Sequence, residues 1–308
     1  MTKQIRIAGG TRTVTGNKSM IDAMTPSSPN YRLGIILVTA SAIAWSTAGL
    51  FTRIITLDVA TMLVWRGIFG AIGVFTVAVA LQGRSAFNDF TRMGWPGWIF
   101  ATVSAFGMLC FITSLRLTTV AHVSIIYATV PFVAAALAWL VIGERPSRSA
   151  IVASLVSLVG VAIIVGLGRE GALSGNILAF GMTLSLAAMM VIARKYNDIP
   201  TMPAAAVSAV LSALVAIPFS QSLGVSGTDL GLLALFGLVN SAVGLALFTI
   251  GSRLLPPVET ALIGALDAPL APIWVWLFFS EIPSIETMTG GAIVFGAVIT
   301  HIALQNRR

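Results

Sequence analysis

The sequence predicts an all-α, polytopic membrane protein with ten transmembrane helices in two inverted five-helix repeats. Of the 308 residues, 57% are apolar and 9% are charged, and the mean hydropathy is +0.95, whereas roughly 25% of the residues of a soluble domain are charged. The apolar residues form runs of the length that a helix needs to cross a bilayer. The second half of the chain also repeats the pattern of the first.

The first 30 residues are polar and basic, and they lack the apolar stretch of a signal peptide. We expect residues 1–30 to form a disordered cytoplasmic tail. A transit peptide is the alternative, because the tail is rich in Arg and Thr.

Gly, Pro and charged residues divide the remaining chain into ten apolar runs. The runs do not alternate as barrel strands would, and only helices satisfy their own backbone groups in lipid. The expected spans lie near 33–52, 60–81, 97–115, 120–142, 149–167, 175–193, 203–221, 230–252, 257–280 and 287–304.

The Lys and Arg residues set the predicted orientation, because positively charged loops stay in the cytoplasm. With the amino terminus inside, the opposite face carries only Arg53, Arg116 and Arg169. Both termini are then cytoplasmic. The net charge of +7 is scattered between apolar runs, so we expect no nucleic-acid partner. Cys110 is the only cysteine, which excludes an intrachain disulfide and a cysteine metal site; no metal site is predicted.

An internal duplication appears when the chain is aligned with itself so that Arg116 meets Arg253. Without a gap, identical residues then pair as Ser104 with Ser241, Gly107 with Gly244, Trp139 with Trp276, Glu144 with Glu281 and Pro146 with Pro283. Nearer the start, Arg53 meets Arg194. The repeats cover residues 31–168 and 174–305. Because five spans is an odd number, the second repeat is expected to be inverted. This explains why the loop near Arg145 is basic and its counterpart near Glu286 is acidic.

Inverted repeats are typical of transporters, in which two similar halves form a site near mid-membrane. Ionisable residues inside spans are costly and mark candidate sites. His122 and Glu259 fall in the first turns of their spans, so we interpret them as interfacial. Arg66 is deeper and either snorkels or forms an ion pair. Asp267 is expected ten residues into its span, about 15 Å deep; it is paired with Arg66, protonated, or exposed to a pocket that binds an ammonium group.

Neutral polar and aromatic residues complete the candidate substrate site, although each could instead be ordinary helix packing. Prolines in the fourth span and its repeat partner, the ninth, also favour a pocket wall there. Small residues in the fifth and tenth spans indicate a structural rim or a dimer contact, so a monomer or weak homodimer is expected. The candidate site residues are Trp45, Ser46, Arg66, Ser104, Phe106, Tyr127, Asn240, Ser241 and Asp267.

Several stretches resemble the drug/metabolite transporter superfamily, in particular its EamA-type ten-helix members. They are AWSTAGLFTR at 44–53, WRG at 65–67, and PFVAAALAWLVIGERPS at 131–147 with its altered copy at 268–284. WST at 45–47, together with LAF, AA and KY within 178–196, is similar to bacterial exporters of aromatic and other amino acids. The resemblance implies a central cavity framed by spans one to four and six to nine. Leu186 stands where such exporters tend to carry Trp, and Asp267 is unusual at its place.

The resemblance and the repeats together predict a carrier in the bacterial inner membrane. Its expected partners are the lipid bilayer and a small-molecule substrate, an amino acid or similar metabolite, exported by alternating access without cofactor or catalytic residue. Drugs, nucleobases and phosphorylated metabolites are alternative substrates, although a phosphate would favour a second deep cation beside Arg66. An intramembrane hydrolase is disfavoured because HExxH and GxSxG are absent. Inverted repeats also argue against a simple channel.

Overall fold

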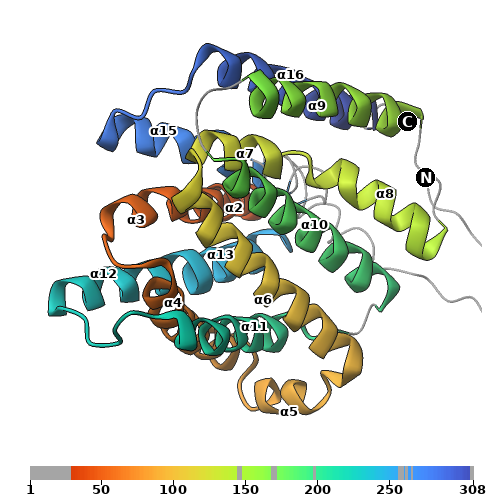
Figure 1. Ribbon diagram of the computed structural model, residues 1–308. Helices are drawn as coiled ribbons and strands as arrows, with labels where there is room; N and C mark the ends of the chain where they lie inside the picture. The colour runs from red at the N-terminus through yellow and green to blue at the C-terminus, as the bar shows by residue number, and fades with distance from the viewer. Residues whose placement is uncertain are drawn as a thin grey trace, which may run out of the picture.

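The computed structural model describes residues 29–143, 148–167, 172–196, 199–255, 260, 263–264 and 266–305, and every regular element among them is helical. Figure 1 shows the helices gathered in one bundle. In chain order they are α2 (Pro29–Ser46), α3 (Ala48–Ile54), α4 (Val59–Gln82), α5 (Ser85–Thr91), α6 (Gly94–Leu117), α7 (Val120–Tyr127), α8 (Val130–Ile142), α9 (Arg148–Leu167), α10 (Leu173–Lys195), α11 (Thr201–Ala216), η1 (Ile217–Phe219), α12 (Gly227–Gly237), η2 (Leu238–Val243), α13 (Gly244–Gly251), α15 (Asp267–Phe279) and α16 (Ile285–Gln305).

Six helices in the described residues are long and apolar enough to cross a membrane, and the bent pair α7 and α8 would make a seventh span. They correspond to expected spans one to four and six to eight. The other three expected spans fall on shorter apolar helices at Ile151–Ile163, Asp267–Phe279 and Ile285–Thr300. The chain is therefore a multi-pass, all-helical membrane protein, while the count of ten crossings stays a prediction.

Interruptions in four helices bring polar groups inward. Thr47 separates α2 from α3, and α7 and α8 are bent by 40° just before Pro131. A π-helical turn, η2, separates α12 from α13. Within the expected ninth span, Asp267 is the first residue of α15. Pro269 explains this start, because proline lacks an amide hydrogen and is tolerated in a first helical turn.

The two halves of the chain are interleaved rather than separate. The most extensively packed helix pairs each take one member from each half, namely α6 with α10, α9 with α16, α4 with α11 and α2 with α13. Gly67 allows the close approach of α4 to α11, since a Cβ there would lie 2.6 Å from the Ala209 carbonyl oxygen. The buried core includes Phe51, Ile112 and Phe236.

Helices α9 and α16 lie side by side along one edge of the bundle (Figure 1). Gly160 allows their contact, since a Cβ there would lie 2.7 Å from the Gly290 carbonyl oxygen. Ala153 and Ser157 are buried, but Ala292 and Gly296 are exposed. Of the small residues noted in these spans, those on α9 therefore face inward, and those on α16 face outward.

Candidate functional site

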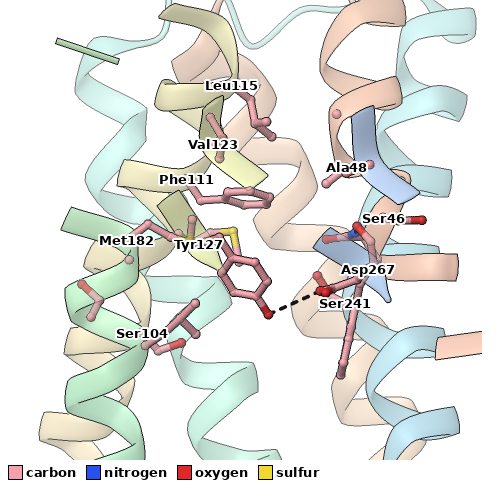
Figure 2. A pocket seen from close by; sticks show the side chains of 18 of the residues that line it. Ser46, Ala48, Ser104, Phe111, Leu115, Val123, Tyr127, Met182, Ser241 and Asp267 are labelled. Carbon is pink, nitrogen blue, oxygen red and sulfur yellow. Dashed lines mark hydrogen bonds between the residues drawn. The ribbon is translucent and has the colours of Figure 1, made fainter. Parts of the chain in front are cut away.

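A cavity of about 400 Å³ lies among the helices, within the size range of small-molecule sites. Figure 2 shows side chains from both halves of the chain converging on it. Its described lining residues come from α2, α3, α4, α6, α7, α10, α11, η2, α13 and α15, and none of them comes from α8, α9 or α16. This agrees with the expected central cavity framed by all spans except the fifth and tenth.

Eight of the nine candidate residues line this cavity: Trp45, Ser46, Arg66, Ser104, Tyr127, Asn240, Ser241 and Asp267. The ninth, Phe106, was placed wrongly; its side chain is 57% exposed on the outside of the bundle. The face of α6 that meets the cavity carries Ser104, Gly107 and Phe111. Helical periodicity of 3.6 residues turns Phe106 away from that face.

Arg66 is buried, with 3% of its surface exposed, so it does not snorkel. Its Nη2 donates to Asn240 Oδ1 at 2.8 Å, and its guanidinium lies 4.8 Å from the Phe236 ring centre. Its Nε has no hydrogen-bond partner among the described residues. Asn240 Nδ2 donates to the carbonyl oxygens of Ala44 and Trp45, at 3.3 and 3.1 Å. The amide oxygen of Asn240 is thereby fixed toward Arg66.

Asp267 faces the cavity from the amino-terminal end of α15, where the helix dipole favours a carboxylate. Tyr127 on α7 donates its hydroxyl hydrogen to Asp267 Oδ2 across a long 3.4 Å, and Figure 2 shows the two side chains pointing toward one another. Asp267 Oδ1 is buried and lacks a hydrogen-bond partner in the described chain. The expected alternative of an ion pair with Arg66 is not formed, since the only ion pair among described residues joins Arg53 and Glu281.

The neutral polar residues mostly have partners already. Trp274 donates its indole hydrogen to Ser46 Oγ at 2.8 Å, and Ser208 donates to Ser104 Oγ at 2.8 Å. Trp274 and Ser208 were not predicted, because no motif distinguishes them from other helix residues. The rest of the wall is apolar and is formed by Met108, Phe111, Leu115, Met182, Leu186 and Met189.

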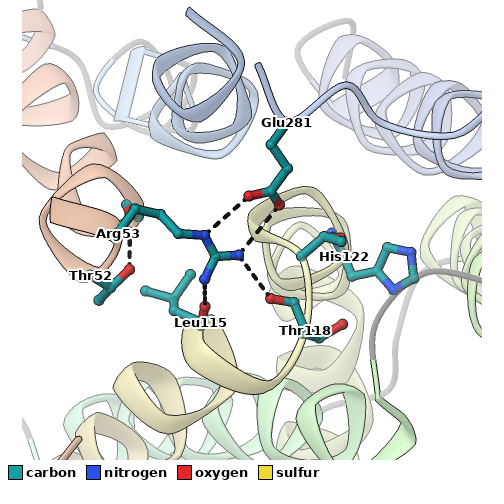
Figure 3. A network of polar contacts seen from close by, with 8 residues as sticks. Thr52, Arg53, Leu115, Thr118, His122 and Glu281 are labelled. Carbon is teal, nitrogen blue, oxygen red and sulfur yellow. Dashed lines mark hydrogen bonds and ion pairs between the residues drawn. The ribbon is translucent and has the colours of Figure 1, made fainter. Parts of the chain in front are cut away.

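A polar cluster lies next to the cavity at Leu115, one of its lining residues (Figure 3). Arg53 Nε lies 3.1 Å from Glu281 Oε2, with both side chains about a quarter exposed, at 22% and 28%. Arg53 also donates to the carbonyl oxygens of Leu115 and Thr118, at 2.7 and 3.3 Å. Reciprocally, Arg116 donates to the Ile55 and Leu57 carbonyl oxygens. An arginine from each of α3 and α6 therefore binds carbonyl oxygens at the end of the other helix, where a positive charge is favourable.

A second, smaller cavity of about 270 Å³ adjoins this cluster at Glu281. Glu281 lines the second cavity, Leu115 lines the central one, and Val120 lines both. The Arg53 and Glu281 cluster is thus adjacent to both cavities.

His122 is fully buried, so its interpretation as an interfacial residue was wrong. Its Nδ1 lies 3.2 Å from Asn176 Oδ1, and its Nε2 lies 3.0 Å from Thr287 Oγ1. Thr118 donates to the same Asn176 oxygen at 3.0 Å. Because an amide oxygen only accepts, Nδ1 carries a proton. The repeat partner, Glu259, lies outside the described residues, as do Glu144, Arg145 and residues 1–28.

Similarity to known proteins assigns the chain to a family. The sequence model of the EamA-like transporter family matches the chain twice, at residues 32–166 and 173–302. One solved structure, named "Crystal structure of protein", matches with a TM-score of 0.63 and 20% sequence identity, covering 89% of this chain and 98% of its own; at that identity the likeness shows the fold alone. No curated protein matches the chain in sequence. The two adjacent matches agree with the internal duplication.

Proposed function

Because the chain belongs to the EamA-like transporter family, we propose that it exports amino acids or similar small metabolites across the bacterial inner membrane by alternating access. The observation that carries the proposal is the central cavity, which collects buried polar groups from both halves of the chain. We propose that the neighbouring Arg53 and Glu281 cluster closes one end of it. The family comprises transporters, so no catalytic residue is assigned.

Contacts between loops support an alternating path through the membrane. In the expected topology, the loops after spans one, three, five, seven and nine share one face. Glu281, after the ninth span, contacts Arg53 at the end of the first, and the Ala172 amide, after the fifth, donates to the Leu117 carbonyl oxygen, after the third. The Ser222 carbonyl oxygen, after the seventh, accepts from Thr61 at the start of α4. These contacts agree with the shared face that alternation predicts.

An asymmetry between the repeats supports a state with one mouth closed. Arg116 is partly buried and donates to two carbonyl oxygens, whereas its repeat partner Arg253 is exposed. If the repeats are inverted, these residues lie at opposite ends of the bundle. Exchanging the two local conformations would open the end near Arg116 and close the other, which is the transport cycle of inverted-repeat carriers.

The cavity wall favours an amino acid over a phosphorylated metabolite. Arg66 is the only cation among the described lining residues, and a phosphate group carries about two negative charges near neutral pH. A single arginine would leave part of that charge without a partner, and unpaired buried charge is costly. A carboxylate of charge −1 suits one guanidinium.

A transport assay tests the proposal. Purified protein in proteoliposomes is expected to exchange at least one radiolabelled amino acid faster than empty liposomes. Ser104→Trp, which fills the cavity, is expected to lower the exchange rate at least tenfold. Phe106→Trp is the matched control on the outer face of the same helix, and its rate is expected to stay close to wild type. Absence of exchange for every amino acid would overturn the substrate class, and equal rates for the two variants would exclude the cavity as the route.

A further inference from the structure

The geometry points to a zwitterion as the solute of the central cavity: its carboxylate binds at Arg66 and its ammonium group binds at Asp267. This inference rests on the proposed function and narrows it to free amino acids with apolar side chains. Amines and carboxylic acids that carry only one of the two charges would bind more weakly.

The charges of the cavity wall are balanced. Arg66 and Asp267 are the charged residues among its described lining residues, one of each sign. They lie on different elements, α4 and α15, and they form no ion pair with each other. A solute with one charge of each sign could therefore approach both without first breaking a salt bridge.

Each charged group keeps one buried atom without a hydrogen-bond partner in the described chain, Nε on Arg66 and Oδ1 on Asp267. A buried donor or acceptor left unsatisfied costs about 1–3 kcal/mol, and more when it is charged. The carboxylate of an amino acid accepts from a guanidinium N–H, and its ammonium group donates to a carboxylate oxygen. A zwitterion therefore carries a suitable partner for each of the two charged side chains.

The neighbouring polar groups hold these two side chains in place. Asn240 directs its oxygen at Arg66 because its amide hydrogens are engaged by the Ala44 and Trp45 carbonyl oxygens. Tyr127 occupies Oδ2 of Asp267 and leaves Oδ1 unpartnered among described residues. The two anchors are thus oriented before any solute arrives, which limits the entropy lost on binding.

The rest of the wall suits an apolar side chain. Phe111, Met182 and Leu186 line the same cavity, and Figure 2 shows Phe111 and Met182 across from Asp267. Methionine side chains adapt to irregular apolar shapes. A cation would leave Arg66 without its counter-charge here, and an anion would leave Asp267 without one.

Three probes with the same phenyl group separate these cases: L-phenylalanine, 2-phenylethylamine, which lacks the carboxylate, and 3-phenylpropanoate, which lacks the ammonium group. Their affinities are measured by calorimetry on the full-length protein in detergent. We expect wild type to bind phenylalanine at least tenfold more tightly than either relative. Arg66→Gln should bind phenylalanine no more tightly than 2-phenylethylamine, but still more tightly than 3-phenylpropanoate. Asp267→Asn should bind phenylalanine no more tightly than 3-phenylpropanoate, but still more tightly than 2-phenylethylamine.

Gel filtration checks that each variant is folded. If the neutral variants do not fold, Arg66→Lys and Asp267→Glu, which keep the charges, replace them; both should bind the three probes in the same order of affinity as wild type. Glu286→Gln, an exposed charge on α16, is the control and should change no affinity ratio. The inference is overturned if wild type binds none of the probes, if it binds a singly charged probe as tightly as phenylalanine, or if both neutral variants weaken all probes equally. Binding with the expected pattern but without exchange in proteoliposomes would contradict transport alone, and exchange without the pattern would contradict only the zwitterion site.

Discussion

Arg53 and Glu281 join the end of α3 to the segment after α15, with Nε and Oε2 3.1 Å apart and a second contact of 3.4 Å between Nη2 and Oε1. The two residues are 228 positions apart in sequence and belong to different repeats. The same guanidinium binds two carbonyl oxygens at the end of α6. One side chain therefore holds three segments together at the end of the central cavity that we propose to be closed.

Removal of the Glu281 charge should loosen this closure. A partly exposed ion pair is worth up to about 1 kcal/mol, so Glu281→Gln should shift the closed-to-open ratio by about fivefold. Arg53→Gln should have the larger effect because it also removes the bonds to Leu115 and Thr118. The measurement is the rate at which a membrane-impermeant maleimide labels Ser241→Cys from that face, in a Cys110→Ala background. Glu286→Gln, with its charge exposed in the same region, is the control, and a labelling rate unaffected by Glu281→Gln would count against the closure.

The close approach of α4 and α11 depends on Gly67. A Cβ at this position would lie 2.6 Å from the backbone oxygen of Ala209 and 2.8 Å from Ala213 Cβ. Overpacking of this kind costs about 1–3 kcal/mol, so Gly67→Ala should lower the unfolding temperature in detergent. Gly231→Ala on α12 is the matched control, since a Cβ added there would have no atom within 4 Å. Equal unfolding temperatures for the two variants would show that the helices do not pack so closely.

Asn176 supplies the acceptor for two buried donors, His122 Nδ1 and Thr118 Oγ1. Replacement by leucine keeps the volume similar and removes the acceptor, which should cost about 1–3 kcal/mol. We expect Asn176→Leu to unfold at a lower temperature than wild type. Asn88→Leu, at an exposed position on α5, should have little effect. An Asn176→Leu variant that unfolds at the same temperature as wild type would show that the hydrogen bond between His122 and Asn176 does not contribute to stability.

Asp58 caps α4 outside the membrane-spanning helix, where its Oδ1 accepts from the Thr61 amide at 2.9 Å. Partial burial opposes its ionised form, but hydrogen bonds from Thr61 and from the Gln221 and Ala60 amides outweigh this, so the pKa of Asp58 lies below its ordinary value. Its stabilising effect is present above the unfolded-state pKa of about 3.9 and is lost as pH falls through the lower folded-state pKa.

Asp58→Ala should therefore cost about 1 kcal/mol at pH 7 and less at pH 3. Asp58→Asn, which keeps a capping oxygen without a titratable group, should lose less stability at pH 7. Chemical unfolding of the three proteins at both pH values checks this. A cost of Asp58→Ala that is the same at pH 3 and pH 7 would contradict the role of the ionised cap.

The cavity residues were largely predictable because polar and charged side chains inside apolar spans are costly and tend to face the interior. Arg66, Asn240 and Asp267 stand out in this way from sequence alone. The prediction for Phe106 was wrong because an aromatic residue in a span suits lipid as well as a cavity. Only its position on α6 relative to Ser104 decides between the two. The sequence suggested the family and the duplication, both of which the family match confirms.

Features that depend on tertiary contacts were not predictable. The π-helical turn that brings Asn240 to Arg66 contains no proline and has no sequence signature. His122 falls near a span end in sequence, yet Asn176 and Thr287 from two other helices bury it. The pairing of Arg53 with Glu281 requires knowledge of how α3, α6 and α15 meet, although the charge pattern had assigned both residues to the same face.

The central claim is that the cavity must open at the Arg53 and Glu281 end for the solute to pass. Cross-linking of Arg53→Cys to Glu281→Cys with a short reducible thiol reagent, in a Cys110→Ala background, tests it most directly. Amino-acid exchange in proteoliposomes should stop after cross-linking and return after reduction, while each single-cysteine variant treated in the same way keeps exchanging. Undiminished exchange by fully cross-linked protein would show that the solute does not pass this end of the cavity.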